Sequence, residues 1–333
     1  MKEMHNPYLM FLGDVADQLA AKTAKGIVDW RPDWCSGQLR LPGCKADLGI
    51  ADMGIAEAVE NGARTMIVGI VNSGGFLPDH WISVITEALD AGLDVASGLH
   101  IRLGSIPEIK AAAERNGRTL FDVRHPTQTI PTGKGTPRSG KRLLAVGTDC
   151  SIGKMYTALA LEKEMKARGM KADFRATGQT GIFIAGSGIS IDAVVADFIS
   201  GAVEMLSPAN DADHWDLIEG QGSLFHASYA GVSLGLLHGA QADALILCHE
   251  PTRIHMRGLP HMPIPGLEEC MELNLALARL TNKNAAFYGI AINSSGLPED
   301  ARTDYLASVE KRLGLPTVDP FRDGTARIVD NLP

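Results

Sequence analysis

The fold of this chain is decided by residues 143–155, which read LLAVGTDCSIGKM. A short apolar run, typical of a buried strand, leads directly into a loop that contains Gly147, Gly153 and Lys154. In a phosphate-binding loop, backbone N–H groups at a helix N-terminus surround an anion while the lysine reaches its phosphates. Residues 156–169 then have the amphipathic pattern of a helix that ends at a glycine. The stretch therefore predicts a strand, a phosphate loop and a helix.

The predicted loop departs from the standard pattern at its last position. A Walker loop places a serine or threonine hydroxyl on Mg²⁺, and this chain has Met155 there. Because Mg²⁺ requires hard oxygen ligands, a thioether cannot replace that hydroxyl. We therefore expect a loop that holds a phosphorylated cofactor without cleaving it; a plain turn between strand and helix is the alternative. The residues expected to bind the cofactor are Gly147, Thr148, Cys150, Ser151, Ile152, Gly153, Lys154 and Met155.

Length and composition indicate which class of protein this chain belongs to. A length of 333 residues, with 45% hydrophobic and 21% charged residues, fits two ordinary globular domains. The net charge of −8 argues against a nucleic-acid partner, which calls for a basic surface. The five cysteines include no C-x-x-C pair, and the apolar run 8–12 is too short for a signal or membrane segment. We expect a cytoplasmic homo-oligomer that acts on a small molecule, away from membranes.

The chain divides around residues 126–142, PTQTIPTGKGTPRSGKR, which carry four cations and no acid. This composition predicts a linker between domains; an alternative is a basic lid over an anionic ligand. Residues 1–125 alternate short apolar runs with helical patterns, which indicates βαβ units and a parallel sheet. Residues 143–333 continue from the phosphate loop with further buried-type strands. The predicted class is α/β, with a P-loop NTPase-like C-terminal domain and a mostly parallel sheet.

Two carboxylates are candidates for acid–base chemistry. Glu219 follows the apolar strand 214–218, where a P-loop fold carries its Walker B carboxylate. Without a magnesium hydroxyl in the loop, Glu219 could serve as a general base, bind a substrate ammonium, or only cap a turn. Asp149 lies inside the phosphate loop, where it requires a neighbouring cation or amine. We predict both as catalytic residues.

Polar side chains at strand ends are candidates for substrate binding, because ligands of open α/β sheets lie there. A guanidinium grips a carboxylate through two parallel hydrogen bonds, which favours arginines as clamps. Surface ion pairs are the alternative for each of them. The predicted substrate-binding residues are Arg175, Gln179, Arg253 and Asn72.

Histidines do not predict a metal site. His249, His255 and His261 recur every six residues, a spacing that places them on one face of neither a helix nor a strand. We therefore predict no metal. His226 is a separate general-base candidate if its loop folds toward the phosphate site.

Longer strings carry a resemblance to known families. The octapeptide GTDCSIGK resembles the phosphate loop of dethiobiotin synthetase. Over almost its whole length the chain resembles the D-glutamate N-acetyltransferase family, formerly a domain of unknown function. The resemblance rests on FLGDVADQLAAKTAKGIVDWRPDWC, GGFLPDHW, DVASGLH, VGTDCSIGKMYTALA, DFRATGQTGIFIAG, DLIEGQGSLFH and CHEPTR.

This resemblance implies a Rossmann-like N-terminal domain, a P-loop C-terminal domain, and acetyl transfer from acetyl-CoA to the amine of D-glutamate in D-amino acid catabolism. Coenzyme A carries phosphates that need to be held but not cleaved, so a loop without its magnesium hydroxyl suffices. Two alternatives stay open. One is an ATP- and Mg²⁺-dependent ligase or kinase of dethiobiotin synthetase type, which would need another hydroxyl on the metal. The other is a protein that binds a nucleotide or coenzyme A without catalysis.

Overall fold

The structure is a computed structural model that describes residues 4–70 and 77–333. Contacts divide the chain into two compact units, here called the N-terminal and the C-terminal unit. The N-terminal unit comprises Met1–Thr127 and Gly178–Ala193, and the C-terminal unit comprises Gln128–Thr177 and Val194–Pro333. A segment from the second half of the chain therefore completes the first unit.

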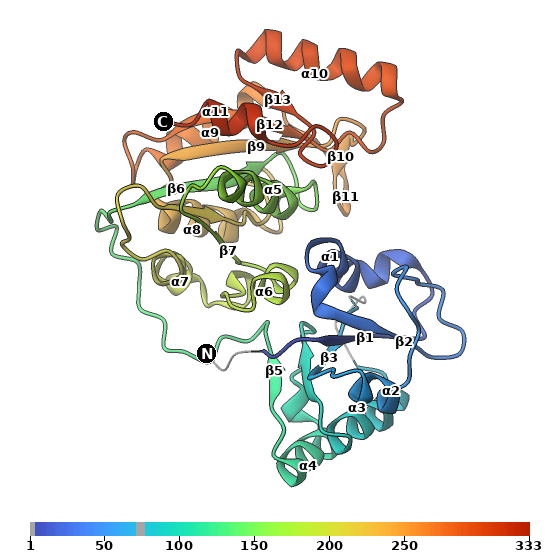
Figure 1. The fold of residues 1–333 in the computed structure, drawn as a ribbon. Coiled ribbons are helices and arrows are strands. Elements are labelled where there is room, and N and C mark those ends of the chain that lie inside the picture. The colour runs from blue at the N-terminus through green and yellow to red at the C-terminus, as the bar shows by residue number, and fades with distance from the viewer. Residues whose placement is uncertain (1–3, 71–76) are drawn as a thin grey trace. The chain divides into compact units, whose positions relative to one another are not determined.

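The N-terminal unit is a parallel sheet covered by helices on both faces (Figure 1). Its strand order β2-β1-β3-β4-β5 is a doubly wound arrangement. Helix α6, from the distant segment, packs beside α1, whereas α3 and α4 pack together. The strands are β1 (Tyr8–Gly13), β2 (Cys35–Arg40), β3 (Thr65–Val68), β4 (Asp94–Ser97) and β5 (Leu120–Asp122). The helices are α1 (Lys22–Trp30), α2 (Ile55–Glu60), α3 (Asp79–Asp90), α4 (Pro107–Asn116) and α6 (Gln179–Ala185).

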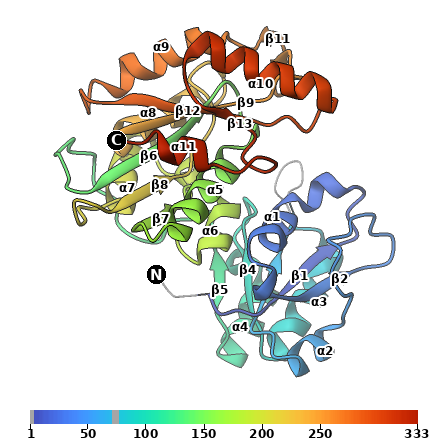
Figure 2. The same cartoon turned by 45° about the horizontal axis from the view of Figure 1, so that its top comes forward.

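The C-terminal unit contains a parallel sheet with the strand order β13-β12-β9-β6-β8-β7 (Figure 2). Helix α5 packs on β6, β7 and β8 and also contacts α11, whereas α8 packs on β6 between α7 and α9. The strands are β6 (Lys141–Gly147), β7 (Ala172–Arg175), β8 (Trp215–Ile218), β9 (Ala244–His249), β12 (Ala286–Ile292) and β13 (Thr317–Val318). The helices are α5 (Lys154–Ala167), α7 (Ile199–Leu206), α8 (Ala230–Ala240), α9 (Leu267–Ala278), α10 (Glu299–Leu313) and α11 (Ala326–Asp330).

These sheets confirm the predicted α/β class. Strands β6 and β9 lie inside the sheet, and their near-continuous apolar sequence matches a strand covered on both faces. A small antiparallel hairpin of β10 (His255–Met256) and β11 (Leu259–Pro263) stands apart from the parallel sheets. No helix within residues 4–70 and 77–333 combines the length and the apolar character needed to cross a membrane.

Residues 128–142, the part of the predicted linker that belongs to the C-terminal unit, pack onto that unit. Both Nη atoms of Arg138 donate to backbone carbonyls at the ends of α7 and α8, among them Ser207 and Gly239, each at 2.6 Å. Pro131 runs so close to α7 that a Cβ on Gly201 would lie 1.9 Å from its carbonyl oxygen. Arg142 is buried and donates to the carbonyl of Ser139. These arginines therefore anchor the segment, which does not support the alternative of a basic lid.

The end of β8 approaches β6 closely at Gly220, the residue after Glu219. A Cβ at position 220 would lie 1.6 Å from the carbonyl oxygen of Ala145 and 2.9 Å from Cδ of Lys154. The contact with Ala145 involves backbone, so it cannot be relieved by turning a side chain. Only glycine allows the carboxyl ends of these two strands to meet beside the phosphate loop.

We predict that Gly220→Ala lowers the free energy of unfolding by about 3 kcal/mol, because the added methyl group forces the two strands apart. Gly231→Ala in α8 is the matched control, since a Cβ added there would have no heavy atom within 4 Å. That control should be neutral or more stable by about 0.5–1 kcal/mol, because alanine favours helix. Urea unfolding of both variants measures the difference, and equal stabilities would contradict the close approach.

Candidate functional site

The phosphate loop has the backbone shape that anion binding requires. Ser151 and Gly153 have φ angles of 55° and 111°, so the chain turns through left-handed conformations just before α5. Lys154 opens that helix, and its buried Nζ donates to the backbone carbonyl of Asp149 at 2.6 Å. Burial lowers the pKa of Lys154, because the charged ammonium loses hydration. An anion at this helix N-terminus would restore charge compensation to the lysine.

Asp149 and Arg253 form an ion pair that braces the loop. Asp149 is fully buried, and its Oδ2 accepts hydrogen bonds from Nη1 of Arg253 at 2.7 Å and from the backbone N–H of Arg257 at 2.9 Å. Its Oδ1 accepts from the backbone N–H of Cys150 at 2.7 Å. Arg253 also donates to the carbonyl of Cys150 at 2.7 Å. Arg253 is therefore the cation that an acid in this loop requires.

These contacts decide what Asp149 can do chemically. Burial raises the pKa of its carboxyl group, and the hydrogen bonds from Arg253, Arg257 and Cys150 outweigh that effect, so the pKa lies below its usual value. A carboxylate with a lowered pKa and donors on both oxygens is a weak proton acceptor. The geometry favours a positioning role for Asp149 over the predicted role of general base.

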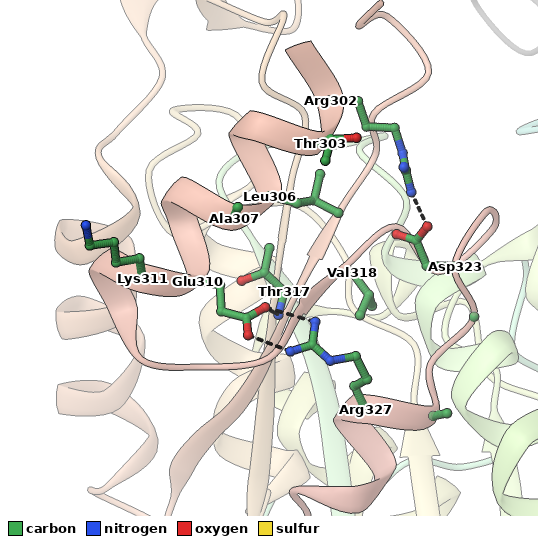
Figure 3. Close-up of a pocket in the computed structure, with 12 residues that line it drawn as sticks. Arg302, Thr303, Leu306, Ala307, Glu310, Lys311, Thr317, Val318, Asp323 and Arg327 are labelled. Atoms are coloured by element: carbon green, nitrogen blue, oxygen red, sulfur yellow. Dashed lines mark hydrogen bonds and ion pairs between the residues drawn. The ribbon is translucent and has the colours of Figure 1, made fainter. Parts of the chain in front are cut away.

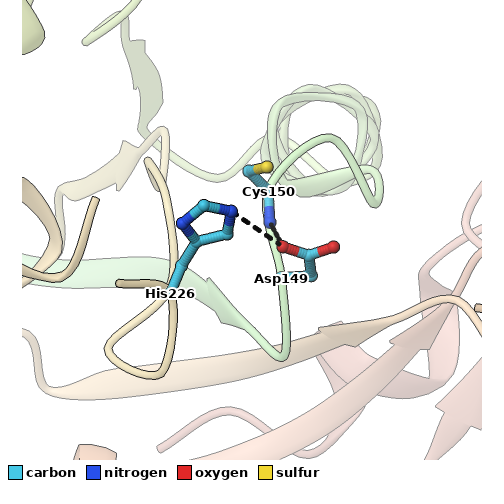
Figure 4. A group of neighbouring side chains, drawn as sticks. All are labelled: Asp149, Cys150 and His226. Atoms are coloured by element: carbon cyan, nitrogen blue, oxygen red, sulfur yellow. Dashed lines mark hydrogen bonds and ion pairs between the residues drawn. The ribbon is translucent and has the colours of Figure 1, made fainter. Parts of the chain in front are cut away.

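Asp149, Cys150 and His226 gather at the loop, with possible ligand atoms within 4.8 Å of one another (Figure 4). Nδ1 of His226 accepts from the backbone N–H of Ser228 at 3.2 Å, so Nε2 carries the proton and donates to the carbonyl of Arg257 at 3.0 Å. Both ring nitrogens are therefore engaged. Burial and the nearby Asp149 raise the pKa of the Cys150 thiol. For Nδ1 of His226 to bind a metal or accept a proton, its hydrogen bond from Ser228 would have to break.

Glu219 lies at the carboxyl end of β8, beside the loop. It is buried, and its Oε2 accepts from the backbone N–H of Thr177 at 2.8 Å. The hydroxyl of Thr177 donates to the Glu219 carbonyl at 2.6 Å and accepts from Gln221 at 3.2 Å. Gly220 brings this strand end against the Lys154 side chain. Glu219 is therefore held in one orientation next to the phosphate loop.

His249 is a site residue that the sequence did not predict. It ends β9, the strand next to β6, and its Nδ1 shares a hydrogen bond of 2.9 Å with the hydroxyl of Thr148. Burial lowers the pKa of His249 to about 4, so the ring is neutral at physiological pH. Its place at the end of an apolar strand was a usable signal. This signal was not used, because His249 was considered only as a metal ligand together with His255 and His261.

The remaining loop positions divide between packing and exposure. Ile152 is buried, and it lies within 2.6 Å of the position that a Cβ on Gly147 would occupy. Met155 is half-buried, and Ser151 is exposed. The hydroxyl of Thr157 donates to the carbonyl of Gly153 at 3.0 Å, so it is directed back into the helix.

The predicted substrate-binding residues do not form one cluster in the described residues. Arg175 donates to Asp216 at 2.7 Å, and β6 and β8 separate its strand from β9, which precedes Arg253. Three strand spacings correspond to about 14 Å. Gln179 belongs to the other unit, on α6, and Asn72 lies outside the described residues. Both arginine head groups are thus paired with carboxylates of the protein itself.

A separate pocket of about 580 Å³ lies at the β13 edge of the C-terminal sheet, between α10 and α11 (Figure 3). Four of its charged residues are paired with one another: Glu310 binds both Nη atoms of Arg327, and Arg302 binds Asp323. The phosphate-loop residues do not line it. The pocket is a feature of the sheet edge, distinct from the candidate site.

Comparison with known proteins is consistent over the full length. The chain is 56% identical to a D-glutamate N-acetyltransferase of Tritonibacter scottomollicae, with 99% of each chain covered. It is 49% identical to a D-glutamate N-acetyltransferase of a Pseudoalteromonas species, with 98% of each covered. The chain belongs to the D-glutamate N-acetyltransferase family. The family recognised from the sequence is thereby confirmed.

Family models and a solved structure agree with this membership. Residues 129–329 match the P-loop domain of DUF1611, described as a domain of unknown function, and residues 39–126 match its Rossmann-like domain. The crystal structure of a DUF1611 family protein from Anabaena variabilis superposes with a TM-score of 0.87 at 31% identity, covering 98% of this chain and 99% of that one. The predicted combination of a Rossmann-like and a P-loop domain is confirmed.

We predict that Asp149→Asn lowers the free energy of unfolding by about 3 kcal/mol, because it leaves Arg253 without its buried anionic partner. Asp304→Asn, at an exposed position on α10, is the control and should change stability by less than about 0.5 kcal/mol. Denaturant unfolding of both variants provides the measurement. A fully stable Asp149→Asn protein would argue against the brace.

His249 should make folding stability depend on pH. The folded ring stays neutral down to about pH 4, whereas the unfolded ring takes up a proton below about pH 6.5, so acid favours the unfolded state. Relative to His249→Gln, we expect the native chain to lose up to about 3 kcal/mol between pH 6.5 and 4. His255→Gln, at an exposed position, should follow the native profile. Unfolding curves across this range test it, and parallel profiles for native and His249→Gln chains would contradict it.

Proposed function

We propose that this chain transfers the acetyl group of acetyl-CoA to the amino group of D-glutamate in D-amino acid catabolism. The observation that carries the proposal is the similarity, over almost the whole chain, to two proteins named D-glutamate N-acetyltransferase. Membership of this family makes the chain an acyltransferase. The donor, the metal requirement and the residue roles are inferred from the site.

The phosphate loop supports coenzyme A as the donor. Lys154 and the first N–H groups of α5 offer a positive site for phosphates. Two hydroxyls of this region are engaged, because Thr148 is bonded to His249 and Thr157 to the carbonyl of Gly153. A loop that holds phosphates without a hydroxyl for Mg²⁺ suits a cofactor whose pyrophosphate stays intact. We therefore propose a reaction that needs no metal, with an ATP-dependent ligase as the outcome to exclude.

Glu219 is the proposed general base. The substrate ammonium loses a proton to the Glu219 carboxylate, and the freed amine attacks the thioester carbon. The C–S bond then breaks, and the departing thiolate of coenzyme A takes up the proton that the nitrogen loses as it becomes the amide. Glu219 is preferred over Asp149, because the lowered pKa of Asp149 makes its carboxylate a weak proton acceptor. Positioned base catalysis contributes about 10²- to 10⁴-fold in rate.

A thiol-release assay with acetyl-CoA tests the reaction and the substrate together. We expect release that depends on D-glutamate, exceeds the rate with L-glutamate or no amino acid, and survives EDTA. Glu219→Gln should lower kcat by about 10²-fold or more while the KM for acetyl-CoA stays within about twofold. Glu272→Gln, at an exposed position on α9, is the control and should match the native chain.

Other outcomes of this assay would contradict the substrate, the reaction or the base that we propose. No release with D-glutamate would remove that substrate assignment, and ADP formation with ATP and Mg²⁺ would favour the ligase. Full activity in Glu219→Gln would leave acetyl transfer in place and exclude Glu219 as the base.

A further inference from the structure

The C-terminal unit displays an aromatic side chain that is largely exposed. Phe321, in the turn after β13, has 75% of its surface exposed, more than any other large hydrophobic residue in the described chain. An exposed phenylalanine forgoes a large favourable burial, so its position calls for an explanation. Its ring lies near that of Tyr156, with the two centroids 6.3 Å apart at an interplanar angle of 55°.

The turn that carries Phe321 is held firmly. Asp319 is buried at the end of β13, and its Oδ1 accepts from the backbone N–H groups of Phe321 at 2.9 Å and Arg322 at 3.3 Å. Its Oδ2 accepts from the backbone N–H and the hydroxyl of Ser294, after β12. Asp323 closes the turn by accepting from the backbone N–H of Asp319 at 2.9 Å. Phe321 is therefore presented on a pre-organised support.

Tyr156 ties this support to the phosphate loop. It lies two residues beyond Lys154, in the first turn of α5, about 3 Å further along the helix axis. The turn after β13 and the loop after β6 both follow carboxyl ends of parallel strands, so they open at the same sheet edge. The aromatic pair and Lys154 therefore lie at the same edge of the C-terminal sheet.

We propose that Phe321, with the tilted ring of Tyr156 beside it, forms a platform on which the adenine ring of coenzyme A stacks. The proposal rests on the function proposed above, which supplies the occupant. Adenine presents a flat π-face that stacks on aromatic side chains, and each such contact contributes measurably to binding. The platform assigns the nucleotide end of the donor to the β13 side of the loop, which leaves the thioester end to reach Glu219 on the β8 side.

Calorimetric titration of the full chain tests the platform directly. Phe321→Ala should weaken binding of CoA and of adenosine 3′,5′-bisphosphate by a common factor between about 5- and 100-fold. Binding of inorganic pyrophosphate, which has no base, should not change, and Phe321→Tyr should restore the affinity for both adenine ligands. The control is Leu280→Ala, which truncates another large apolar side chain with 70% exposure.

Turnover separates this proposal from the function it rests on. Phe321→Ala should raise the KM for acetyl-CoA by the same factor and leave kcat with D-glutamate within about twofold. Equal CoA affinities in the native and Phe321→Ala chains would overturn the platform whether or not D-glutamate is acetylated. A loss confined to ATP, with CoA unaffected, would also overturn it and assign the platform to ATP. If the native chain fails to acetylate D-glutamate but Phe321→Ala still weakens CoA binding, only the function fails.

Discussion

The buried ion pair between Asp149 and Arg253 determines the shape of the phosphate loop. A carboxylate inside an anion-binding loop would repel its ligand, and its burial without a partner would be costly. Arg253 removes both problems, because one guanidinium neutralises Asp149 and also holds the carbonyl of Cys150. The segment after β9, which carries Arg253, thereby holds residues 149 and 150 of the loop that follows β6. With these residues held, the left-handed residues Ser151 and Gly153 can direct the loop into α5.

The same pairing sets the charge that an incoming ligand meets. Arg253 pairs with both Asp149 and Glu250, and His249 adds no charge because burial keeps its ring neutral. The positive groups that the loop offers are Lys154 and the positive end of the α5 dipole, and the carboxylate of Glu219 lies beside the loop. Lys154 is buried against a carbonyl oxygen, so a phosphate can replace that contact with an ion pair. The site is therefore suited to hold phosphates by electrostatics alone, which matches the absence of a hydroxyl at Met155.

Local sequence was sufficient for the parts of the fold that local forces determine. The run from Leu143 to Val146 is apolar because β6 is buried on both faces, and this is visible without any partner strand. Strand β2, CSGQLR, cannot be predicted locally, because its sequence lacks both a continuous apolar run and a clean alternation. Its pairing with β1 forms it instead. Residues 178–193 give no local sign that α6 packs beside α1, since that depends on contacts between distant segments.

In the candidate site too, the residue types could be read from the sequence, whereas the partner of each side chain could not. The loop, Glu219 and Asp149 could be predicted as candidates, because residue type and place relative to a strand are visible in the sequence. It assigned Arg175 and Arg253 to a substrate, although both bind carboxylates of the chain, because the partners Asp216 and Asp149 lie far away in sequence.

The cost of burying a charged group explains both arginine pairs, Arg175 with Asp216 and Arg253 with Asp149. An arginine near a buried aspartate pairs with it before any ligand arrives, since leaving that aspartate unpaired would cost several kcal/mol. D-Glutamate could use either guanidinium only by breaking such a pair. Its carboxylates are therefore better served by donors that do not already neutralise a buried acid. The partner of each strand-end residue therefore shows whether the residue holds the protein's own structure or is available to the substrate. Residue type alone does not show this.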